Sequence, residues 1–140
     1  MDIFLTREDR KFRDFCREFA REKLADAADI HGETNEVPPQ MVRDMAEAGL
    51  FQLYVPESLG GRGLKTLHVC LAREEMAGIF CPADVTMAMQ GLGSYPILLA
   101  GSDAQKQRYL PEIGNGRLLT TYALTEPEAG SDVNGIQSRA

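Results

Sequence analysis

The feature that most constrains the fold is the three- and four-residue spacing of apolar side chains near the N-terminus. The stretch Thr6-Arg7-Glu8-Asp9 has the pattern of a helix capping box. The apolar residues that follow recur at helical steps: Phe12, Phe15, Cys16, Phe19, Ala20, Leu24 and Ala27. Because charged residues fill the other positions, the pattern predicts an amphipathic helix of about 24 residues that ends before Gly32.

Two further helices are predicted between positions 37 and 78. Val37-Pro38-Pro39 opens the first, because proline is tolerated in an initial helical turn, and Gly49 ends it. The apolar segment 50–56 that follows is expected to be an extended link. The second helix spans 66–78, and its apolar side is expected to include Leu67, Cys70, Leu71, Glu74 and Ala77.

Another pair of helices is predicted between positions 84 and 116. Asp84 is expected to cap a helix that is apolar on nearly every side and therefore buried on several sides. Three residues are expected to loosen or break this helix: Gly91, Gly93 and Pro96. A second capping box, Ser102-Asp103-Ala104-Gln105, opens a charged helix that Gly114 and Gly116 close.

Only the segment 118–124 has the composition of a strand. A lone strand cannot satisfy its own backbone groups, so its partner strands are expected beyond residue 140. The predicted fold class is therefore all-α, with a helical bundle over residues 1–117. Residues 118–140 are expected to be the truncated start of a β-domain.

The charge and the cysteines narrow the range of ligands. The 140 residues carry a formal net charge of −6. This argues against nucleic acid as a partner, because phosphate binding requires a basic surface. Three cysteines without a C-x-x-C pair argue against a disulfide framework or a zinc site, so no metal ligand is assigned. They are expected to be small buried side chains in a reducing compartment: Cys16, Cys70 and Cys81.

No targeting or membrane-spanning segment is predicted. The N-terminus has neither a basic region nor a long apolar run, and it is too acidic for a typical transit peptide. No apolar run approaches the ~18 residues that a membrane span requires. A bacterial-type cytoplasmic location is therefore expected.

The glycine-rich stretch 56-PESLGGRGLKT-66 matches no phosphate-binding motif. A P-loop requires Gly-Lys-Ser/Thr, whereas Leu64 separates Gly63 from Lys65. These glycines are expected to supply turns with positive φ instead.

Four stretches together resemble a known family. The segment 122-YALTEPEAGSDVNG-135 resembles the signature of the FAD-dependent acyl-CoA dehydrogenases. Three earlier stretches resemble that family's N-terminal helical domain, in order and spacing: 12-FRDFCREFAREKLA-25, 47-EAGLFQLYVPESLGGRGL-64 and 101-GSDAQKQRYLPEIGNG-116. The resemblance covers essentially the whole chain.

The resemblance implies the first part of a three-part subunit, with a helical N-terminal domain, a small β-domain and a helical C-terminal bundle. FAD would lie between the last two parts, with the acyl thioester against the flavin. A carboxylate base would remove the α-proton while the β-hydride passes to flavin N5, which yields a 2-enoyl-CoA. An electron-transferring flavoprotein would reoxidise the flavin, and the full-length protein would be a homo-oligomer, commonly a tetramer.

Only part of the family's site has counterparts in this sequence. Tyr122, Leu124 and Thr125 match positions along the flavin, and Thr125 is the expected partner of its pyrimidine edge. Ser131 matches a position that contacts both cofactor and acyl-CoA. The family's catalytic base has no counterpart here, so no catalytic residue is assigned and the chain alone is expected to be inactive.

The resemblance implies that the helix containing residues 86–92 lines the acyl-chain tunnel, as this region does in the family. The candidate substrate-binding residues there are Met87, Met89 and Gln90, with ordinary core packing as the alternative. For the loop itself, the alternative is a purely structural role in which Thr125 and Glu128 form a capping box and Ser131-Asp132 form a turn. As alternatives for the protein, a related flavin oxidase or monooxygenase of the same fold, or a standalone helical binding module, stay open.

Overall fold

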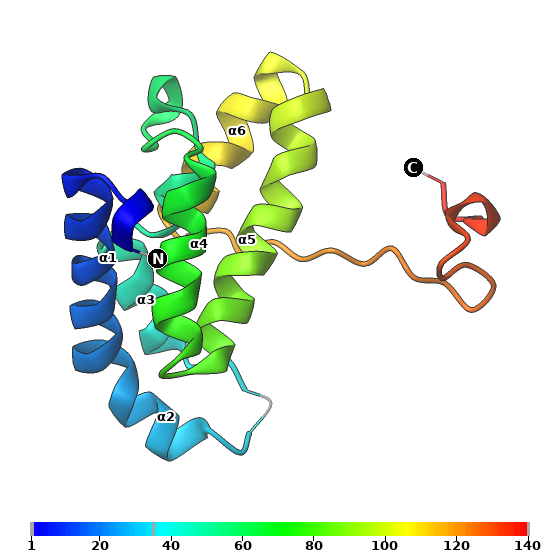
Figure 1. The fold of residues 1–140 in the computed structure, drawn as a ribbon. Helices are drawn as coiled ribbons and strands as arrows, with labels where there is room; N and C mark the ends of the chain where they lie inside the picture. The colour runs from blue at the N-terminus through cyan, green and yellow to red at the C-terminus, as the bar shows by residue number, and fades with distance from the viewer. Residues whose placement is uncertain (1, 35, 140) are drawn as a thin grey trace.

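Residues 2–34 and 36–139, which the computed structural model describes, form six α-helices (Figure 1). Their bounds are α1 (Arg7–Phe19), α2 (Ala25–His31), α3 (Pro39–Glu47), α4 (Thr66–Ala77), α5 (Cys81–Ala100) and α6 (Asp103–Gly114). Shorter helical turns lie before, between and after them: η1 (Asp2–Phe4), η2 (Ala20–Leu24), η3 (Phe51–Tyr54), η4 (Glu57–Leu59) and η5 (Val133–Gly135). Because α1 packs against α4 and α4 against α5, the helices form a bundle. This confirms the predicted all-α fold class.

The predicted first helix is confirmed, with one irregular turn. Thr6 and Asp9 form the expected reciprocal cap: the Asp9 N–H donates to Thr6 Oγ1 over 3.1 Å, and the Thr6 N–H donates to Asp9 Oδ2 over 2.9 Å. The helix then runs through the π turn η2 into α2, and Gly32 follows the last helical residue.

The link after α3 differs from the expected extended segment. Gly49 ends α3 with φ of 72°, as predicted, but residues 51–54 close into the 3-10 turn η3. Leu50, Phe51 and Leu53 are almost fully buried there. A turn satisfies part of the backbone locally, through bonds such as Leu53 N–H to Leu50 O, and this allows a short apolar run to enter the core.

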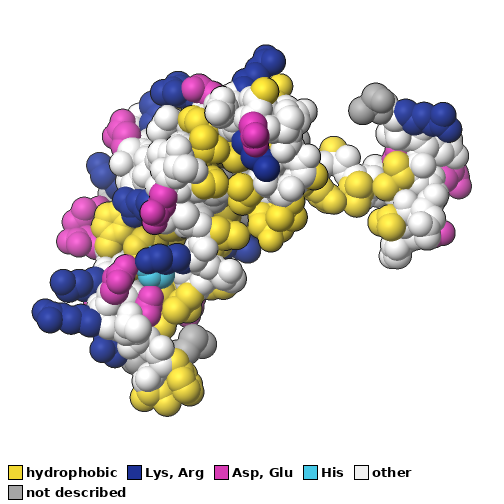
Figure 2. All heavy atoms as spheres, turned by 90° about the horizontal axis from the view of Figure 1, so that it is seen from above, with side chains coloured by type: hydrophobic (Ala, Val, Ile, Leu, Met, Phe, Trp, Pro, Cys, Tyr) yellow, Lys and Arg dark blue, Asp and Glu magenta, His cyan; other side chains and the backbone are white. Residues whose placement is uncertain are grey.

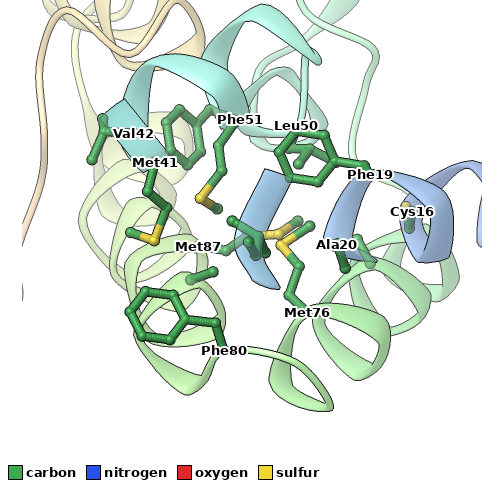
Figure 3. Close-up of a cluster of buried hydrophobic side chains, with 14 of the residues drawn as sticks. Cys16, Phe19, Ala20, Met41, Val42, Leu50, Phe51, Met76, Phe80 and Met87 are labelled. Atoms are coloured by element: carbon green, nitrogen blue, oxygen red, sulfur yellow. The ribbon is translucent and has the colours of Figure 1, made fainter. Parts of the chain in front are cut away.

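The main core lies between α1, α3, α4 and α5 (Figure 3). Its largest fully buried side chains include Leu24, Met41, Met45, Phe51, Met76 and Met87. Each such side chain contributes about 1.5–3 kcal/mol of transfer free energy on burial. Cys16 belongs to this core, and burial raises the pKa of its thiol to about 12. Cys70 and Cys81 are exposed, so the prediction that all three cysteines are buried is wrong for these two.

The buried side of α4 also differs from the predicted one. Leu67 and Cys70 are exposed, whereas the buried residues are His68, Leu71, Ala72 and Met76. His68, Ala72 and Met76 follow one another at four-residue steps, so they lie on one face of the helix. Because the first of these residues, His68, is polar, the spacing of apolar residues in the sequence did not indicate that this face is buried.

Helix α5 begins earlier and ends later than predicted. It starts at Cys81, directly after Phe80, and Asp84 lies inside its first turn rather than at its cap. The Asp84 carboxylate instead pairs with Arg73 of α4, with Arg73 Nε donating to Oδ1 over 2.6 Å. The helix continues unbroken to Ala100, so the predicted interruption at Gly91, Gly93 and Pro96 is wrong.

On α5, several polar side chains are buried and several large apolar side chains are exposed, which is the reverse of what its apolar composition predicts. Its buried residues include Thr86, Gln90 and Ser94, whose polar groups all form hydrogen bonds. Its exposed large apolar side chains are Val85, Leu92, Tyr95 and Leu99. Burial on several sides is therefore not found within the described residues. Along one side, α5 carries apolar surface that no described residue covers.

The last helix is confirmed, and the segment after it is not a strand. Ser102 and Gln105 form the expected capping box at the start of α6, and Gly116 follows its end with φ of 67°. Residues 119–125 have no regular secondary structure and run away from the helices (Figure 1). A strand requires a ladder partner, and none occurs among residues 2–34 and 36–139. A strand at 118–124 in a longer protein stays a prediction.

Candidate functional site

The segment 119–125 carries three of the residues assigned to the flavin. Tyr122, Leu124 and Thr125 are all exposed, on a part of the chain that extends from the helical body. Figure 2 shows hydrophobic side chains along this extension and over the neighbouring surface of the body. Within the described residues, therefore, these side chains are not packed against the helices.

The loop that follows Thr125 is organised around one carboxylate. Glu126 and Ala129 exchange backbone hydrogen bonds of 2.9 and 3.2 Å, which close a tight turn. The Glu126 side chain then accepts from the N–H groups of Gln137 and Ser138, over 2.8 and 2.9 Å. Hydrogen bonding from Ser138 and Gln137 lowers the pKa of Glu126. The two ends of a loop of about a dozen residues are thus tied together through one side chain.

This arrangement presents small and polar groups on the outside of the loop. Gly130 has no heavy atom within 4 Å of the position that a Cβ would occupy. Ser131 is exposed, and the side chain of Asp132 accepts from the Asn134 N–H over 3.0 Å, which starts η5. The capping box between Thr125 and Glu128 is not formed by the described residues, since the turn there is closed by Glu126 instead.

The three candidates on α5 occupy different surroundings. Met87 points into the main core and is fully buried (Figure 3). Met89 is partly exposed, and its carbonyl accepts from the Thr120 hydroxyl over 2.9 Å. Gln90 is buried, with its amide engaged by backbone groups after α6. The structure therefore brings Met89 and Gln90 to the base of the extension, but not to Thr125 or Ser131.

A cleft between α1, the segment 53–65 and the start of α4 was not foreseen from the sequence. It has a volume of about 580 Å³, and Phe12, Phe15, Leu53, Arg62, Lys65 and His68 are among its lining residues. The His68 ring stacks on Phe12, with ring centroids 4.4 Å apart, and His68 Nε2 lies 3.0 Å from Asp9 Oδ1. Hydrogen bonding from Thr6, together with His68, holds the pKa of Asp9 below its ordinary value. The four-residue spacing from His68 to Met76 is the sequence signal that could have placed His68 on a packed face.

The chemistry available in the loop is that of hydrogen-bond donors. Backbone N–H groups and the hydroxyls of Thr125 and Ser131 can meet the carbonyl groups of a polar ligand edge and stabilise negative charge that develops there. Glu126 is committed to the loop, so it is a poor proton acceptor for a substrate. Among residues 2–34 and 36–139, no three His, Cys, Asp or Glu side chains gather into a metal-ligand set.

In the part of the chain that the structure describes, no helix combines the length and hydropathy needed to cross a membrane.

Comparison with known proteins gives a consistent result. Residues 6–117 match the sequence model of a family described as "Acyl-CoA dehydrogenase, N-terminal domain". A curated relative described as "Acyl-CoA dehydrogenase", from Bacillus subtilis (strain 168), is 36% identical over 139 residues. The matched region is 99% of this chain and 37% of that relative.

Two solved structures are similar over nearly the whole chain. Butyryl-CoA dehydrogenase from Megasphaera elsdenii superposes with a TM-score of 0.84 at 29% identity, covering 98% of this chain and 37% of that one. An acyl-CoA dehydrogenase complexed with FAD, from Bacillus anthracis, superposes with a TM-score of 0.82 at 30% identity. That match covers 96% of this chain and 23% of the other. The chain thus spans well under half the length of the relatives that it matches.

Proposed function

Because this chain belongs to the acyl-CoA dehydrogenase family, we propose that it is the helical N-terminal part of an FAD-dependent enzyme. The full-length enzyme would convert an acyl-CoA thioester to a 2-enoyl-CoA. We place the boundary of the helical domain at residue 117, with residues 118–140 as the start of the β-domain. The family match, which ends at residue 117, supports this boundary.

The observation that carries the proposal is the loop that follows Thr125. Its shape is fixed internally by Glu126, yet Thr125, Gly130 and Ser131 stay open to the outside. A loop that is held by its own hydrogen bonds, with its outer groups unpartnered, is suited to receive a ligand, because less conformational entropy is lost on binding. In a loop whose only role was structural, these groups would be expected to pack against the rest of the chain.

The donor set fits the polar edge of a flavin. The Thr125 hydroxyl and backbone N–H would hold the carbonyl and N–H groups of the pyrimidine edge, and Gly130 leaves room for close approach of a planar ring. Tyr122 and Leu124 would lie along the flavin. Ser131 would contact both the cofactor and the acyl-CoA. When bound, FAD would supply the hydride acceptor that no side chain can replace.

The part of the reaction assigned to this chain is therefore binding and orientation. The carboxylate base would come from the segment that this chain lacks, since Glu126 is held by Gln137 and Ser138. The family resemblance assigns three residues of α5 to the acyl chain: Met87, Met89 and Gln90. Met87 and Gln90 are buried, whereas the exposed apolar side of α5 supports a nearby position for an acyl group. We also propose an electron-transferring flavoprotein as the electron acceptor, and a homotetramer as the assembly, from family membership.

The test uses the full-length polypeptide that carries this chain. The purified protein is expected to retain FAD, and addition of a suitable acyl-CoA without oxygen should bleach the visible flavin absorption. The 2-enoyl-CoA product is measured by mass spectrometry. Absence of flavin, or no bleaching with acyl-CoAs of any chain length, would overturn the proposal. Rapid oxygen consumption during turnover would assign the protein to the oxidase alternative instead.

A further inference from the structure

We propose that Gln90 is a positioning residue, whose buried amide fixes the point at which residues 119–125 leave the helical body. Through this point it sets where Thr125 lies relative to α5. The inference rests on the proposed function, in which Thr125 meets the flavin, and it replaces direct contact with substrate as the role of Gln90.

The side-chain amide of Gln90 is fully engaged by backbone groups. Its Nε2 donates to Leu118 O over 3.1 Å and to Ile113 O over 3.4 Å. Its Oε1 accepts from the Thr120 N–H over 2.7 Å. Gln90 is only 1% exposed, so its end of these bonds is buried, whereas Thr120 is partly exposed and Leu118 is exposed. Because a glutamine amide has two N–H donors, none remains for a substrate.

Thr120 is the other half of this contact. Its hydroxyl lies 2.9 Å from Met89 O and 3.1 Å from Gln90 Oε1, so both its backbone and its side chain are attached to α5. Gly93 makes the approach possible, since a Cβ at that position would lie 2.3 Å from Thr120 Cβ. Tyr122 and the residues up to Thr125 are exposed. Thr120 is therefore the last described point before Thr125 at which this segment is held to the body.

The burial of the Gln90 amide makes the attachment sensitive to a single change. Replacing Gln90 by methionine keeps a side chain of similar length but leaves the Thr120 N–H and the Leu118 carbonyl without partners. A buried polar group without a hydrogen-bond partner raises the free energy of the folded state. The segment would therefore detach from α5, so that water can hydrate its backbone groups. The helices have their own core between α1, α3, α4 and α5, which does not depend on Gln90.

Amide hydrogen exchange in the 140-residue chain, resolved by nuclear magnetic resonance, tests the attachment directly. In the unaltered chain the Thr120 amide should be protected, and Gln90→Met should increase its exchange rate at least tenfold. Ser94→Ala is the matched control: Ser94 is equally buried on the same helix, but its hydroxyl bonds only to Gly91 O within α5. An unprotected Thr120 amide in the unaltered chain, or an equal change in Ser94→Ala, would overturn the inference.

A second variant keeps the test decisive if Gln90→Met does not fold. Thr120→Val removes the hydroxyl bonds to α5 while every residue of the helix is retained. A smaller increase in the exchange rate of the amide at position 120, of the same sign, is expected. Unchanged exchange in this variant would overturn the inference, because the attachment would then not depend on these contacts.

The consequence for cofactor binding is measured separately, in the full-length polypeptide. Gln90→Met is expected to shift the visible absorption and fluorescence of bound FAD and to weaken its retention several-fold, whereas Ser94→Ala leaves both unchanged. If FAD binds with the same spectrum in all variants, the positioning role is overturned while the proposed function stands. If no variant binds FAD, the proposed function fails, and the positioning of Thr125 toward the flavin fails with it, even if Thr120 exchange responds as expected.

Discussion

Gly91 of α5 lies directly against the ring of Tyr54 in η3. A Cβ at position 91 would be 2.7 Å from Tyr54 Cε1, which is closer than side-chain atoms normally approach. Tyr54 is buried at this contact, and burial raises the pKa of its hydroxyl. The absence of a side chain at position 91 therefore allows η3 to pack against the middle of α5.

Alanine at position 91 is expected to destabilise the fold despite its higher helix propensity. Overpacking against Tyr54 costs about 1–3 kcal/mol. The gain from replacing a helical glycine is about 1 kcal/mol, so the net loss in unfolding free energy should be up to about 2 kcal/mol. Urea unfolding followed by circular dichroism measures it. Gly78→Ala is the matched control, because the nearest atoms to its Cβ lie at 3.6 Å. A higher midpoint for Gly91→Ala than for the unaltered chain would contradict the contact.

The loop closed by Glu126 is expected to open at acidic pH. Its hydrogen bonds depress the pKa of Glu126 below the ordinary 4.5, so the folded loop binds the proton less tightly than the open one. The stabilisation is complete above pH 4.5 and is lost as the pH falls through the lowered pKa. The amide resonances of Gln137 and Ser138 should shift in that range. In Glu126→Gln they should already resemble the acidic form at pH 7, and pH-independent resonances in the unaltered chain would refute the role.

Substitutions of Thr125 and Ser131 should affect the cofactor and not the fold. Each of Thr125→Ala and Ser131→Ala would remove one proposed hydrogen bond to FAD, worth roughly 0.5–1.5 kcal/mol, so FAD retention by the full-length polypeptide should weaken about 2- to 13-fold. The 140-residue chain itself should show no acyl-CoA dehydrogenation, because the proposed base would lie outside it. Ser58→Ala, at an exposed serine of the helical body, provides the control. Retention and kinetics equal to those of this control would leave both residues with only a turn role.

The exposed apolar side of α5 should make the 140-residue chain bind hydrophobic dyes and associate at high concentration. Val85, Leu92 and Leu99 expose 48%, 45% and 66% of their surface. Such surface favours association when nothing covers it. Leu99→Lys should reduce both dye fluorescence and association, measured by analytical ultracentrifugation. Ile30→Lys, at an apolar residue of α2 that is 70% exposed, should reduce them less. A monomer that binds no dye at all would count against this prediction.

The helices were predicted correctly where residues within one turn determine their ends. The errors arose where contacts between residues distant in sequence determine the structure. Thr6 and Ser102 open α1 and α6 through caps formed within one turn. By contrast, Gly91 and Gly93 resemble helix breakers, but in α5 they are points where Tyr54 and Thr120 approach. Spacing alone could not reveal these contacts, because both partners are more than 25 residues away in sequence.

For the candidate site, the sequence predicted a loop but not the hydrogen bonds that fix its shape and attach its base to α5. The resemblance identified Thr125 and Ser131 by position. The two contacts that shape their surroundings involve Glu126 with Ser138, and Gln90 with Thr120. Both join a side chain to a backbone N–H, and any residue except proline can supply such a donor. A sequence pattern therefore carries little information about them.

Because Cys16 is buried, the rate at which a thiol reagent modifies it measures how often the core opens. With its thiol in the core and its pKa raised to about 12, Cys16 is both inaccessible and protonated at neutral pH, whereas Cys70 and Cys81 lie at the surface. A thiol reagent should therefore modify Cys70 and Cys81 rapidly, and Cys16 only when the core opens. The slow phase of modification gives the frequency of that opening, without any introduced probe.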